Sequence, residues 1–204
     1  PRCRPRVAQI GRNSLGSSAE LSALCTEAHQ LGLKVIVDVV ANHTDGGELE
    51  WVADFWKNKD LYHTLGAVSN WQNRYQVTHG EIGMKDLKTE DSRVQSKFKE
   101  YIATLKAIGV DGCRFDAAKH IGLPSEGDNF WPSVIDPTMF NYGEILDNTG
   151  GNDATLLPEY LGYMSITDSP YSTNNVLGAA KNGQATSYGG GNYSFTYNPN
   201  KLVY

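Results

Sequence analysis

The chain has 204 residues, a formal net charge of −5 and 40% hydrophobic residues, a composition typical of a globular protein with one sizeable core. The acidic balance provides no basic surface of the kind that nucleic-acid binding requires. No apolar run reaches the roughly 20 residues that span a bilayer. The three cysteines have neither a metal-ligand spacing nor an even number. We expect Cys25 and Cys113 to be buried as small hydrophobic residues and make no assignment for Cys3.

The two ends of the chain do not read as domain ends. Residues 1–6 are basic but lack the apolar core of a signal peptide, and residues 1–16 carry no readable pattern. Residues 201–204 indicate a strand at the C-terminus. We therefore expect the sequence to be an internal fragment of a longer protein.

A helix and a strand are the first predicted elements. Serine at position 17 or 18 can cap a helix over residues 18–31, which Gly32 ends. Residues 34–40 then form a nearly continuous β-branched run, typical of a parallel strand covered on both faces. The apolar stripe expected for the helix is Leu21, Leu24, Ala28 and Leu31.

Residues 44–85 interrupt this rhythm with no clear helix or strand. A structureless connection of about 40 residues is abnormal, so we interpret it as an inserted irregular subdomain. A strong helix follows from Asp91, its cap, to Ile108, and Gly109 ends it. The expected buried stripe of this helix is Val94, Phe98, Tyr101, Ile102, Leu105 and Ile108.

The remaining elements continue the alternation. Residues 109–120 read as a buried strand that ends in charge. Further strands are predicted at 139–146 and 163–167, with helices at 130–135 and 174–181, a helix or loop before residue 163, and a loop at 183–200. Alternating strands and helices favour parallel βα units and a partial (β/α)8 TIM barrel, about strands 3 to 7. The alternative is an open doubly wound sheet, but the phosphate loop typical of that fold is missing.

Two carboxylates follow neighbouring predicted strands, and this arrangement suggests a chemistry. Arg114 and Asp116 are two residues apart, so they point to the same side of a strand, and the guanidinium favours an ionised Asp116. Glu144 ends the next strand beside apolar residues, where the Asp116 charge disfavours its ionisation. Glycoside hydrolysis uses such a pair, one carboxylate to attack and one to donate a proton. For either residue alone, an ordinary structural acid would remain the better interpretation.

Four segments together resemble the short motifs of the α-amylase family of glycoside hydrolases, and the likeness to secreted bacterial members is strongest in the second and third. It extends from about Ser14 to Tyr204. The segments are Asp-Val-Val-Ala-Asn-His at 38–43, Gly-Cys-Arg-Phe-Asp-Ala-Ala-Lys-His at 112–120, Phe-Asn-Tyr-Gly-Glu-Ile-Leu at 140–146 and Met-Lys-Asp-Leu at 84–87.

The resemblance implies a role for each matching residue. Asp116 corresponds to the catalytic nucleophile and Glu144 to the general acid/base. Arg114 corresponds to the arginine that positions the nucleophile, which in some members also holds a chloride ion. The residues implied to bind substrate are His43, Arg114, Lys119 and His120.

A structural calcium ion is also implied by the resemblance. The matching ligands are Asn42, Asp86, the carbonyl of His120 and a carbonyl from the insert, for which we choose Thr78; oxygen donors suit this cation. The resemblance implies a division into a barrel segment at 1–43, a calcium-associated subdomain at 44–85 and a truncated barrel continuation at 86–204. We interpret Asp38 as an acceptor supporting Arg114, and His29, His63 and His79 as ordinary residues.

The implied activity is retaining hydrolysis of internal α-1,4-glucosidic bonds in starch or glycogen, through a covalent intermediate on Asp116, by a secreted, monomeric enzyme with no membrane or nucleic-acid partner. One alternative is a related α-glucoside hydrolase or a glucanotransferase. The other is a non-catalytic sugar-binding module, but such a module would be expected to lack Asp116 or Glu144, and both are present. The family's third catalytic aspartate belongs to a later motif that would follow Tyr204, and its first two barrel strands have no clear match. We therefore expect the fragment alone to be inactive.

Overall fold

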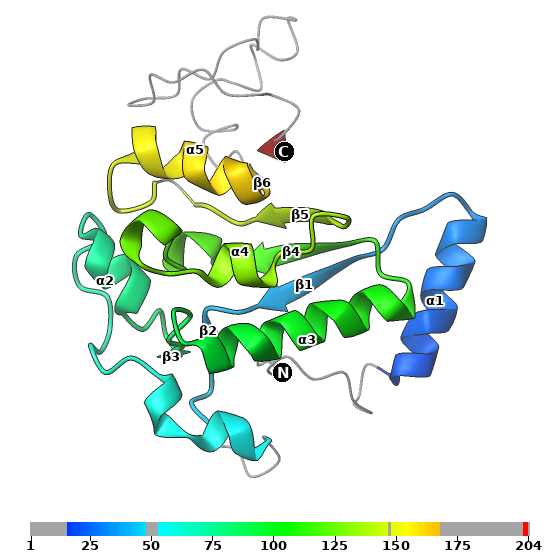
Figure 1. Cartoon of the computed structure of the whole chain (residues 1–204), viewed down its shortest axis with the longest axis horizontal. Helices are drawn as coiled ribbons and strands as arrows, with labels where there is room; N and C mark the ends of the chain where they lie inside the picture. The colour runs from blue at the N-terminus through cyan, green and yellow to red at the C-terminus, as the bar shows by residue number, and fades with distance from the viewer. Residues whose placement is uncertain (1–15, 48–52, 147, 168–201, 204) are drawn as a thin grey trace, which may run out of the picture.

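The computed structural model describes residues 16–47, 53–146, 148–167 and 202–203. Five parallel strands form its central sheet, and their order in the sheet is their order in the chain (Figure 1). These strands are β1 (Ile36–Val40), β4 (Gly112–Asp116), β5 (Phe140–Gly143), β6 (Ser165–Thr167) and β7 (Leu202–Val203).

The register of the sheet brings the strand ends together at one edge. Asp38 lies opposite Arg114 and Val40 opposite Asp116 in the β1–β4 pair, and Phe115 lies opposite Gly143 in the β4–β5 pair. A sequential parallel order with helical connections is the arrangement of a (β/α)8 barrel. The predicted partial barrel sheet is therefore confirmed for the described strands. The residues that directly follow β1, β4 and β5 lie at the same edge of the sheet.

Two long helices support the first half of this sheet. Helix α3 (Ser92–Ile108) is capped by Asp91 and ends at the left-handed Gly109. It buries four members of the predicted stripe and leaves Tyr101 and Ile108 half-buried; the four are Val94, Phe98, Ile102 and Leu105. Helix α1 (Ser18–Gln30) packs against α3 and begins with a capping box. In that box the Ser17 hydroxyl accepts from the Glu20 N–H at 3.3 Å, and the Glu20 carboxylate accepts from the Ser17 N–H at 2.7 Å.

The apolar stripe predicted for α1 is wrong in part. Leu24 and Leu31 are 53% and 72% exposed, whereas Cys25 is buried. The helix packs against α3, with Cys25 beside Gly109 at the end of that helix, whereas Leu24 and Leu31 are on the exposed side. The expectation that Cys25 and Cys113 are buried is confirmed.

The expectation that β1 is covered on both faces is also wrong among the described residues. Only Val39 of this strand is buried, and Ile36 is 41% exposed. The reason is its position, because β4 is its one neighbour in the described sheet. A β-branched run therefore indicated the strand correctly but not its environment.

The insert contains more regular structure than the sequence indicated. It has two 3₁₀ turns, η1 (Asp54–Lys57) and η2 (Lys59–Leu61), a short helix α2 (Arg74–His79), and a strand β3 (Lys85–Asp86) that pairs antiparallel with β2 (His43–Thr44). These elements are too short to show a period. Trp56 and Tyr62 are buried, and Trp56 packs 5.8 Å from Phe98, measured between ring centroids. Trp56 therefore packs the insert against helix α3.

Shorter elements complete the described chain. Helix α4 (Phe130–Val134) and strand β6 agree with prediction, and helix α5 (Asp153–Tyr163) resolves the choice between helix and loop, despite Pro158 within it. Two further 3₁₀ turns are η3 (Ala118–His120) and η4 (Pro124–Glu126). The elements predicted at 174–181 and 183–200, and Cys3, lie outside the described residues. Among the described helices, none combines the length and apolarity that a bilayer crossing needs.

Candidate active site

Arg114 lies at the centre of the polar edge of the sheet. Its Nη1 atom donates to Asp38 Oδ1 and to Asp116 Oδ1, both at 2.7 Å. Asp38 comes from the neighbouring strand β1, directly opposite Arg114. The interpretation of Asp38 as a supporting acceptor is confirmed, and β4 presents Arg114 and Asp116 on one side as the spacing predicted.

Glu144 reaches the same guanidinium from the end of β5. Its Oε1 atom lies 2.9 Å from Arg114 Nη2, and its Oε2 atom accepts from the Ala117 N–H at 3.2 Å. Ala117 has a φ of +50°, the left-handed region that costs energy for a residue with a Cβ. This turn directly after Asp116 aims the Ala117 N–H at Glu144, so the two candidate carboxylates meet at one cation.

The pairing corrects one step of the sequence argument. Arg114 was expected to distinguish Asp116 from Glu144, but it contacts both. Burial alone would lower the pKa of Arg114, and its hydrogen bonds with Asp38 and Asp116 outweigh that effect and hold the pKa above its usual value. Three carboxylates around one guanidinium give the site a negative balance, which suits a reaction that develops positive charge on the substrate.

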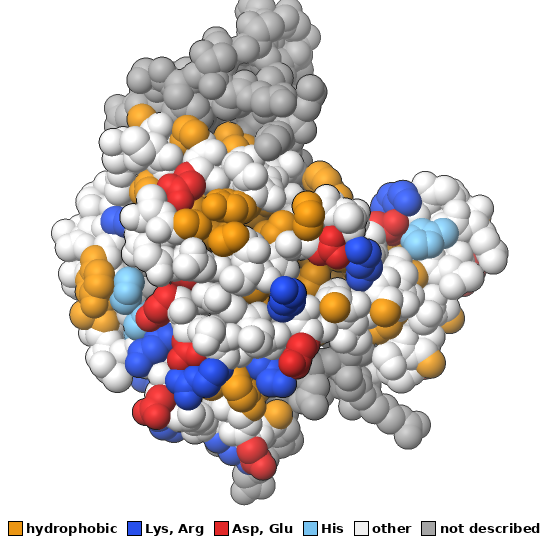
Figure 2. Space-filling view, viewed as in Figure 1, with side chains coloured by type: hydrophobic (Ala, Val, Ile, Leu, Met, Phe, Trp, Pro, Cys, Tyr) orange, Lys and Arg blue, Asp and Glu red, His pale blue; other side chains and the backbone are white. Residues whose placement is uncertain are grey.

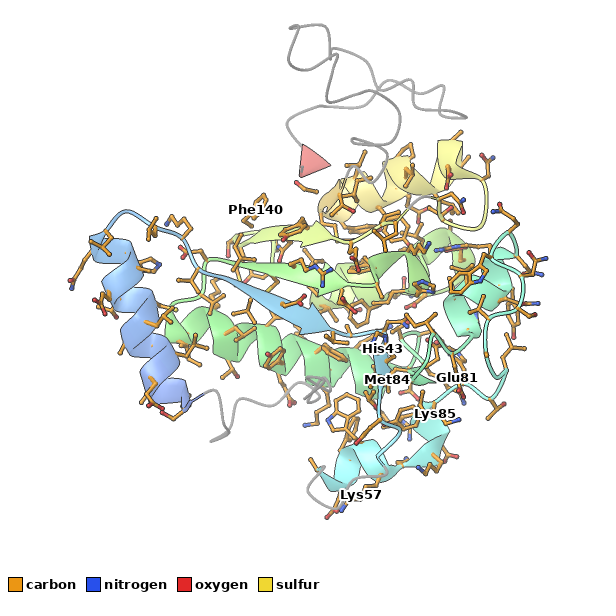
Figure 3. The ribbon with its side chains drawn as sticks, turned by 180° about the vertical axis from the view of Figure 1, so that it is seen from behind. His43, Lys57, Glu81, Met84, Lys85 and Phe140 are labelled. Atoms are coloured by element: carbon orange, nitrogen blue, oxygen red, sulfur yellow. The ribbon has the colours of Figure 1, made fainter. Side chains whose placement is uncertain are left out.

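His43 faces the same site from β2, just beyond the end of β1. Its Nε2 atom is 3.9 Å from Asp116 Oδ2. Burial lowers the pKa of His43, and the Asp116 carboxylate opposes this shift. Figure 3 shows His43 at the carboxyl end of β1 near Met84 and Lys85, far from Phe140 at the start of β5. The structure thus places His43 beside the candidate nucleophile.

Lys119 and His120 follow β4 in η3. Lys119 Nζ donates to the Leu146 carbonyl at 2.8 Å. His120 Nδ1 lies 2.7 Å from the Val77 carbonyl, which can only accept, so Nδ1 carries the hydrogen. Burial lowers the pKa of His120 to about 4. Trp71, half exposed, lies 5.8 Å from both the His120 ring and Lys119 Nζ, measured to ring centroids.

Arg74 is a residue of this region that sequence reasoning missed. From α2 it forms a two-pronged ion pair with Glu126, at 2.8 and 2.7 Å, and donates to the carbonyls of Lys119 and Thr149 and to the Tyr160 hydroxyl. It ties the insert to the segment that carries Lys119 and His120. Its only sequence signal is a charged residue in an aromatic-rich stretch, which does not identify partners 45 to 86 residues away.

The residues expected to hold calcium can be tested against the buried oxygens of the structure. Asn42 and Asp86 are 1% and 0% exposed, and Oδ1 of each is buried without a hydrogen-bond partner. The β2–β3 pairing brings their segments together, and the Leu87 N–H donates to the Asn42 carbonyl at 2.8 Å. Burial raises the pKa of Asp86 to about 7, against the hydrogen bond from His63. An amide oxygen and a carboxylate oxygen, both buried without a donor, fit a hard cation.

The other two expected calcium ligands lie where α2 packs against η3. Thr78 is buried near the end of α2, and the contact of His120 with Val77 joins the two segments.

A chloride ion does not fit beside Arg114, because Nη1 and Nη2 already face three carboxylates. We derive no step through such an ion.

Comparison with known proteins decides the family. The family model of the α-amylase catalytic domain matches residues 9–153. The chain belongs to the α-amylase family of glycoside hydrolases. An α-amylase from Clostridium acetobutylicum is 34% identical over 200 residues, covering 90% of this chain and 26% of that protein.

Solved structures of the α-amylase family agree with this assignment. An α-amylase from Anoxybacillus matches with a TM-score of 0.63 at 28% identity, covering 79% of this chain and 36% of that chain. An α-amylase from Geobacillus thermoleovorans, crystallised with acarbose, matches with a TM-score of 0.61 at 27% identity, covering 78% and 36%. The chain thus spans about a quarter of the curated relative and about a third of each solved α-amylase.

Proposed function

We propose that this chain is the central part of an α-amylase catalytic domain and that its complete polypeptide hydrolyses internal α-1,4-glucosidic bonds of starch or glycogen with retention. The observation that carries the proposal is the meeting of Asp116 and Glu144 on the Arg114 guanidinium. Carboxyl groups held by one guanidinium are close, as a retaining mechanism requires, where the spacing is about 5–5.5 Å.

The proposed chemistry divides the work between these carboxylates. Asp116 attacks the anomeric carbon, and the glycosidic C–O bond breaks as Glu144 gives its proton to the departing oxygen. Glu144 then takes a proton from water, whose oxygen displaces Asp116 from the sugar. Arg114 keeps Asp116 oriented for attack, and the Ala117 N–H orients Glu144.

Substrate binding is proposed for the side chains around this pair. His43 lies on the Asp116 side and would donate to the sugar at the cleavage point. Lys119 lies on the Glu144 side, where its N–H donates to the Glu144 carbonyl at 3.4 Å, and His120 follows it; both would bind the leaving sugar. Trp71 beside them exposes a ring that can stack on a glucose unit.

Calcium would be held by Asn42, Asp86 and the carbonyls of Thr78 and His120. When bound, this ion would supply structural support, because it joins the insert to the strand ends. The division at residues 43 and 85, secretion and a monomeric state remain parts of the same proposal.

The test uses the complete polypeptide with the variants Asp116→Asn and Glu144→Gln, and Asp111→Asn as a control outside the site. We expect kcat on soluble starch to fall on the order of 10⁴-fold for Asp116→Asn and to stay unchanged for the control. NMR should show α-configured products at first release. Full activity of Asp116→Asn, or β-configured products, would contradict the proposal.

A second measurement separates the roles and the alternatives. With a substrate whose leaving group needs no protonation, Glu144→Gln should keep the first step, whereas Asp116→Asn should not. Products longer than the substrate would indicate a glucanotransferase instead. The isolated 204-residue chain should show little or no starch hydrolysis, and robust turnover would contradict its expected dependence on a further carboxylate.

A further inference from the structure

Three side chains of metal-binding type, two in the insert and one just after it, converge outside the catalytic cluster. His63, His79 and Glu90 each offer one ligand atom, and these atoms all lie within 4.8 Å of one another. His63 follows η2, His79 ends α2, and Glu90 precedes the cap of α3. Three separate segments therefore contribute to one cluster.

His63 is held with one nitrogen turned toward the cluster. Its Nδ1 atom lies 2.7 Å from Asp86 Oδ2, and its Nε2 atom lies 3.0 Å from Glu90 Oε1. A carboxylate behind the first nitrogen is the usual outer partner of a metal-ligating histidine, because it fixes the ring and makes the second nitrogen a better donor. Asp86 occupies that outer position here.

His79 is fixed in a similar way. Its Nδ1 atom lies 2.8 Å from the Thr78 hydroxyl, which itself donates to the Arg74 carbonyl, and 3.1 Å from the Tyr75 carbonyl. Both partners can accept from Nδ1, and with the hydrogen on Nδ1 the Nε2 atom keeps its lone pair. The Tyr75 ring stacks on the imidazole with centroids 4.1 Å apart, and the His63 and His79 centroids are 4.4 Å apart. Both imidazoles can thus present Nε2 to one ion.

The backbone around the cluster is well supported. The His63 N–H donates to the Asp86 carbonyl at 3.0 Å, and Lys88 N–H donates to the Leu61 carbonyl at 2.9 Å, which pairs these two segments. Next to Glu90, the Thr89 hydroxyl donates to Asp128 at 2.6 Å within the core. Ligands on firmly held segments lose little freedom when an ion binds.

We propose that His63, His79 and Glu90 form a site for a transition-metal divalent cation of the Zn²⁺ class, with water as the fourth ligand. Two imidazole nitrogens and one carboxylate oxygen suit such an ion, whereas calcium takes oxygen ligands. Ligand atoms around tetrahedral zinc lie about 3.3 Å apart, so a small side-chain adjustment closes the cluster. Glu90 is exposed, and Figure 2 shows histidine atoms at the surface beside α2, which gives the ion access.

The site is distinct from the orphaned oxygens of Asn42 and Asp86, although Asp86 touches both. An ion in the histidine cluster would connect α2 to the start of α3 and so brace the insert. The rival explanation is an ion-paired histidine, in which His63 is protonated between Asp86 and Glu90. The proposal does not depend on the glycosidase function.

The test titrates the complete polypeptide with ZnCl₂ by calorimetry in excess calcium, and with CoCl₂ by visible absorption. We expect one zinc site that calcium does not displace, and the intense visible bands of tetrahedral Co²⁺. The variants His79→Gln and Glu90→Gln should each weaken zinc binding by at least about 100-fold. Losing a ligand should cost more than losing a group that only hydrogen-bonds to a ligand, which typically costs about 10- to 100-fold. His29→Gln is the matched control, because His29 also pairs with a carboxylate, Asp111, at 2.7 Å.

Three results would overturn the proposal. They are no zinc binding, zinc binding that excess calcium abolishes, and equal affinity in the parent and in both variants. Circular dichroism of each variant checks its folding, and two variants on different segments keep the test decisive if one is destabilised. No zinc binding would leave the ion-paired histidine as the description of the cluster.

Discussion

Two polar clusters at the same edge of the sheet differ in how completely the protein satisfies them. Around Arg114, the guanidinium contacts a carboxylate oxygen from each of Asp38, Asp116 and Glu144 at 2.7–2.9 Å. In the Asn42–Asp86 pair, Oδ1 of each residue is buried with no partner. Protein groups alone satisfy the first cluster, whereas the second keeps two buried oxygens without a donor, although Asp86 Oδ2 lies 2.7 Å from His63 Nδ1.

The difference shows how each cluster contributes to stability. A buried polar atom without a partner costs roughly 1–3 kcal/mol, so the Asn42–Asp86 pair destabilises the fold until a cation satisfies it. The carboxylates around Arg114 are paired with its guanidinium, so the cluster has no such energetic cost, and its partly exposed charges remain available to a substrate. We therefore expect changes at Arg114 to affect catalysis first and changes at Asn42 or Asp86 to affect stability first.

The largest stability effect is expected at Arg74, which ties α2 of the insert to the segment that carries Lys119 and Glu126. Arg74→Ala removes both hydrogen bonds to Glu126 and those to the carbonyls of Lys119 and Thr149. Because Glu126 is exposed, we expect the cost to fall mainly on the buried carbonyls, with a loss of about 1–3 kcal/mol in the free energy of unfolding, measured with urea. Arg93→Ala, which removes an exposed pair with Asp91, should leave the midpoint unchanged. Equal midpoints for the two variants would show that the contacts of Arg74 do not hold the insert to this segment.

Arg114→Lys tests the catalytic cluster itself. Lysine keeps the charge but has no planar fork to hold Asp116 and Glu144 together. We expect kcat of the complete polypeptide to fall about 100-fold, similar to the loss of one aligned donor, with a shifted pH profile of kcat. Unchanged kcat and an unchanged profile would mean that the guanidinium geometry is not used in the reaction.

Calcium removal tests the Asn42–Asp86 pair. At a calcium concentration tenfold above its Kd, binding to the folded state alone adds about 1.4 kcal/mol. EDTA should therefore lower the Tm of the complete polypeptide, and Asn42→Ala should make the Tm insensitive to EDTA. A Tm that EDTA does not change would remove the metal from this cluster.

Asp111 gives the smallest expected effect, at the opposite edge of the sheet. Its carboxylate accepts from the Val35 N–H at 2.8 Å and pairs with His29 and Lys34, which lowers its pKa well below the usual value. A depressed folded-state pKa stabilises above the unfolded value of about 3.9, and that stability is lost as the pH falls further. The stability gap between the parent and Asp111→Asn, measured in urea, should be present at pH 7 and shrink below pH about 4. A constant gap would rule out this linkage.

Sequence periodicity predicted the position of the long helices well, but it did not predict which face of α1 is buried or where the short elements of the insert lie. Helix α3 followed its predicted stripe because both its cap and its apolar period are encoded locally. Helix α1 has equally clear caps, yet Leu24 and Leu31 are exposed, because burial depends on which element packs alongside. The short helix α2 and strand β3 have no period to detect.

The candidate catalytic pair was predictable because its residues lie in short, ordered segments at strand ends. Arg114 and Asp116 are two residues apart on one strand, and Glu144 ends the next strand. These positions were sufficient to predict that the two carboxylates lie at neighbouring strand ends. The contact of Arg114 with Glu144 was not predictable, since it depends on the register of β4 and β5 and on the turn at Ala117.

The sequence by itself determined the alternation of strands and helices, the family and the residues at the strand ends. Only the tertiary structure decided what those residues touch: the single guanidinium between two carboxylates, the partners of Arg74, and the meeting of His63, His79 and Glu90. The reason is physical. Hydrogen-bonding patterns and apolar periods are local properties of the chain, whereas charges and ligands pair across segments that only packing brings together.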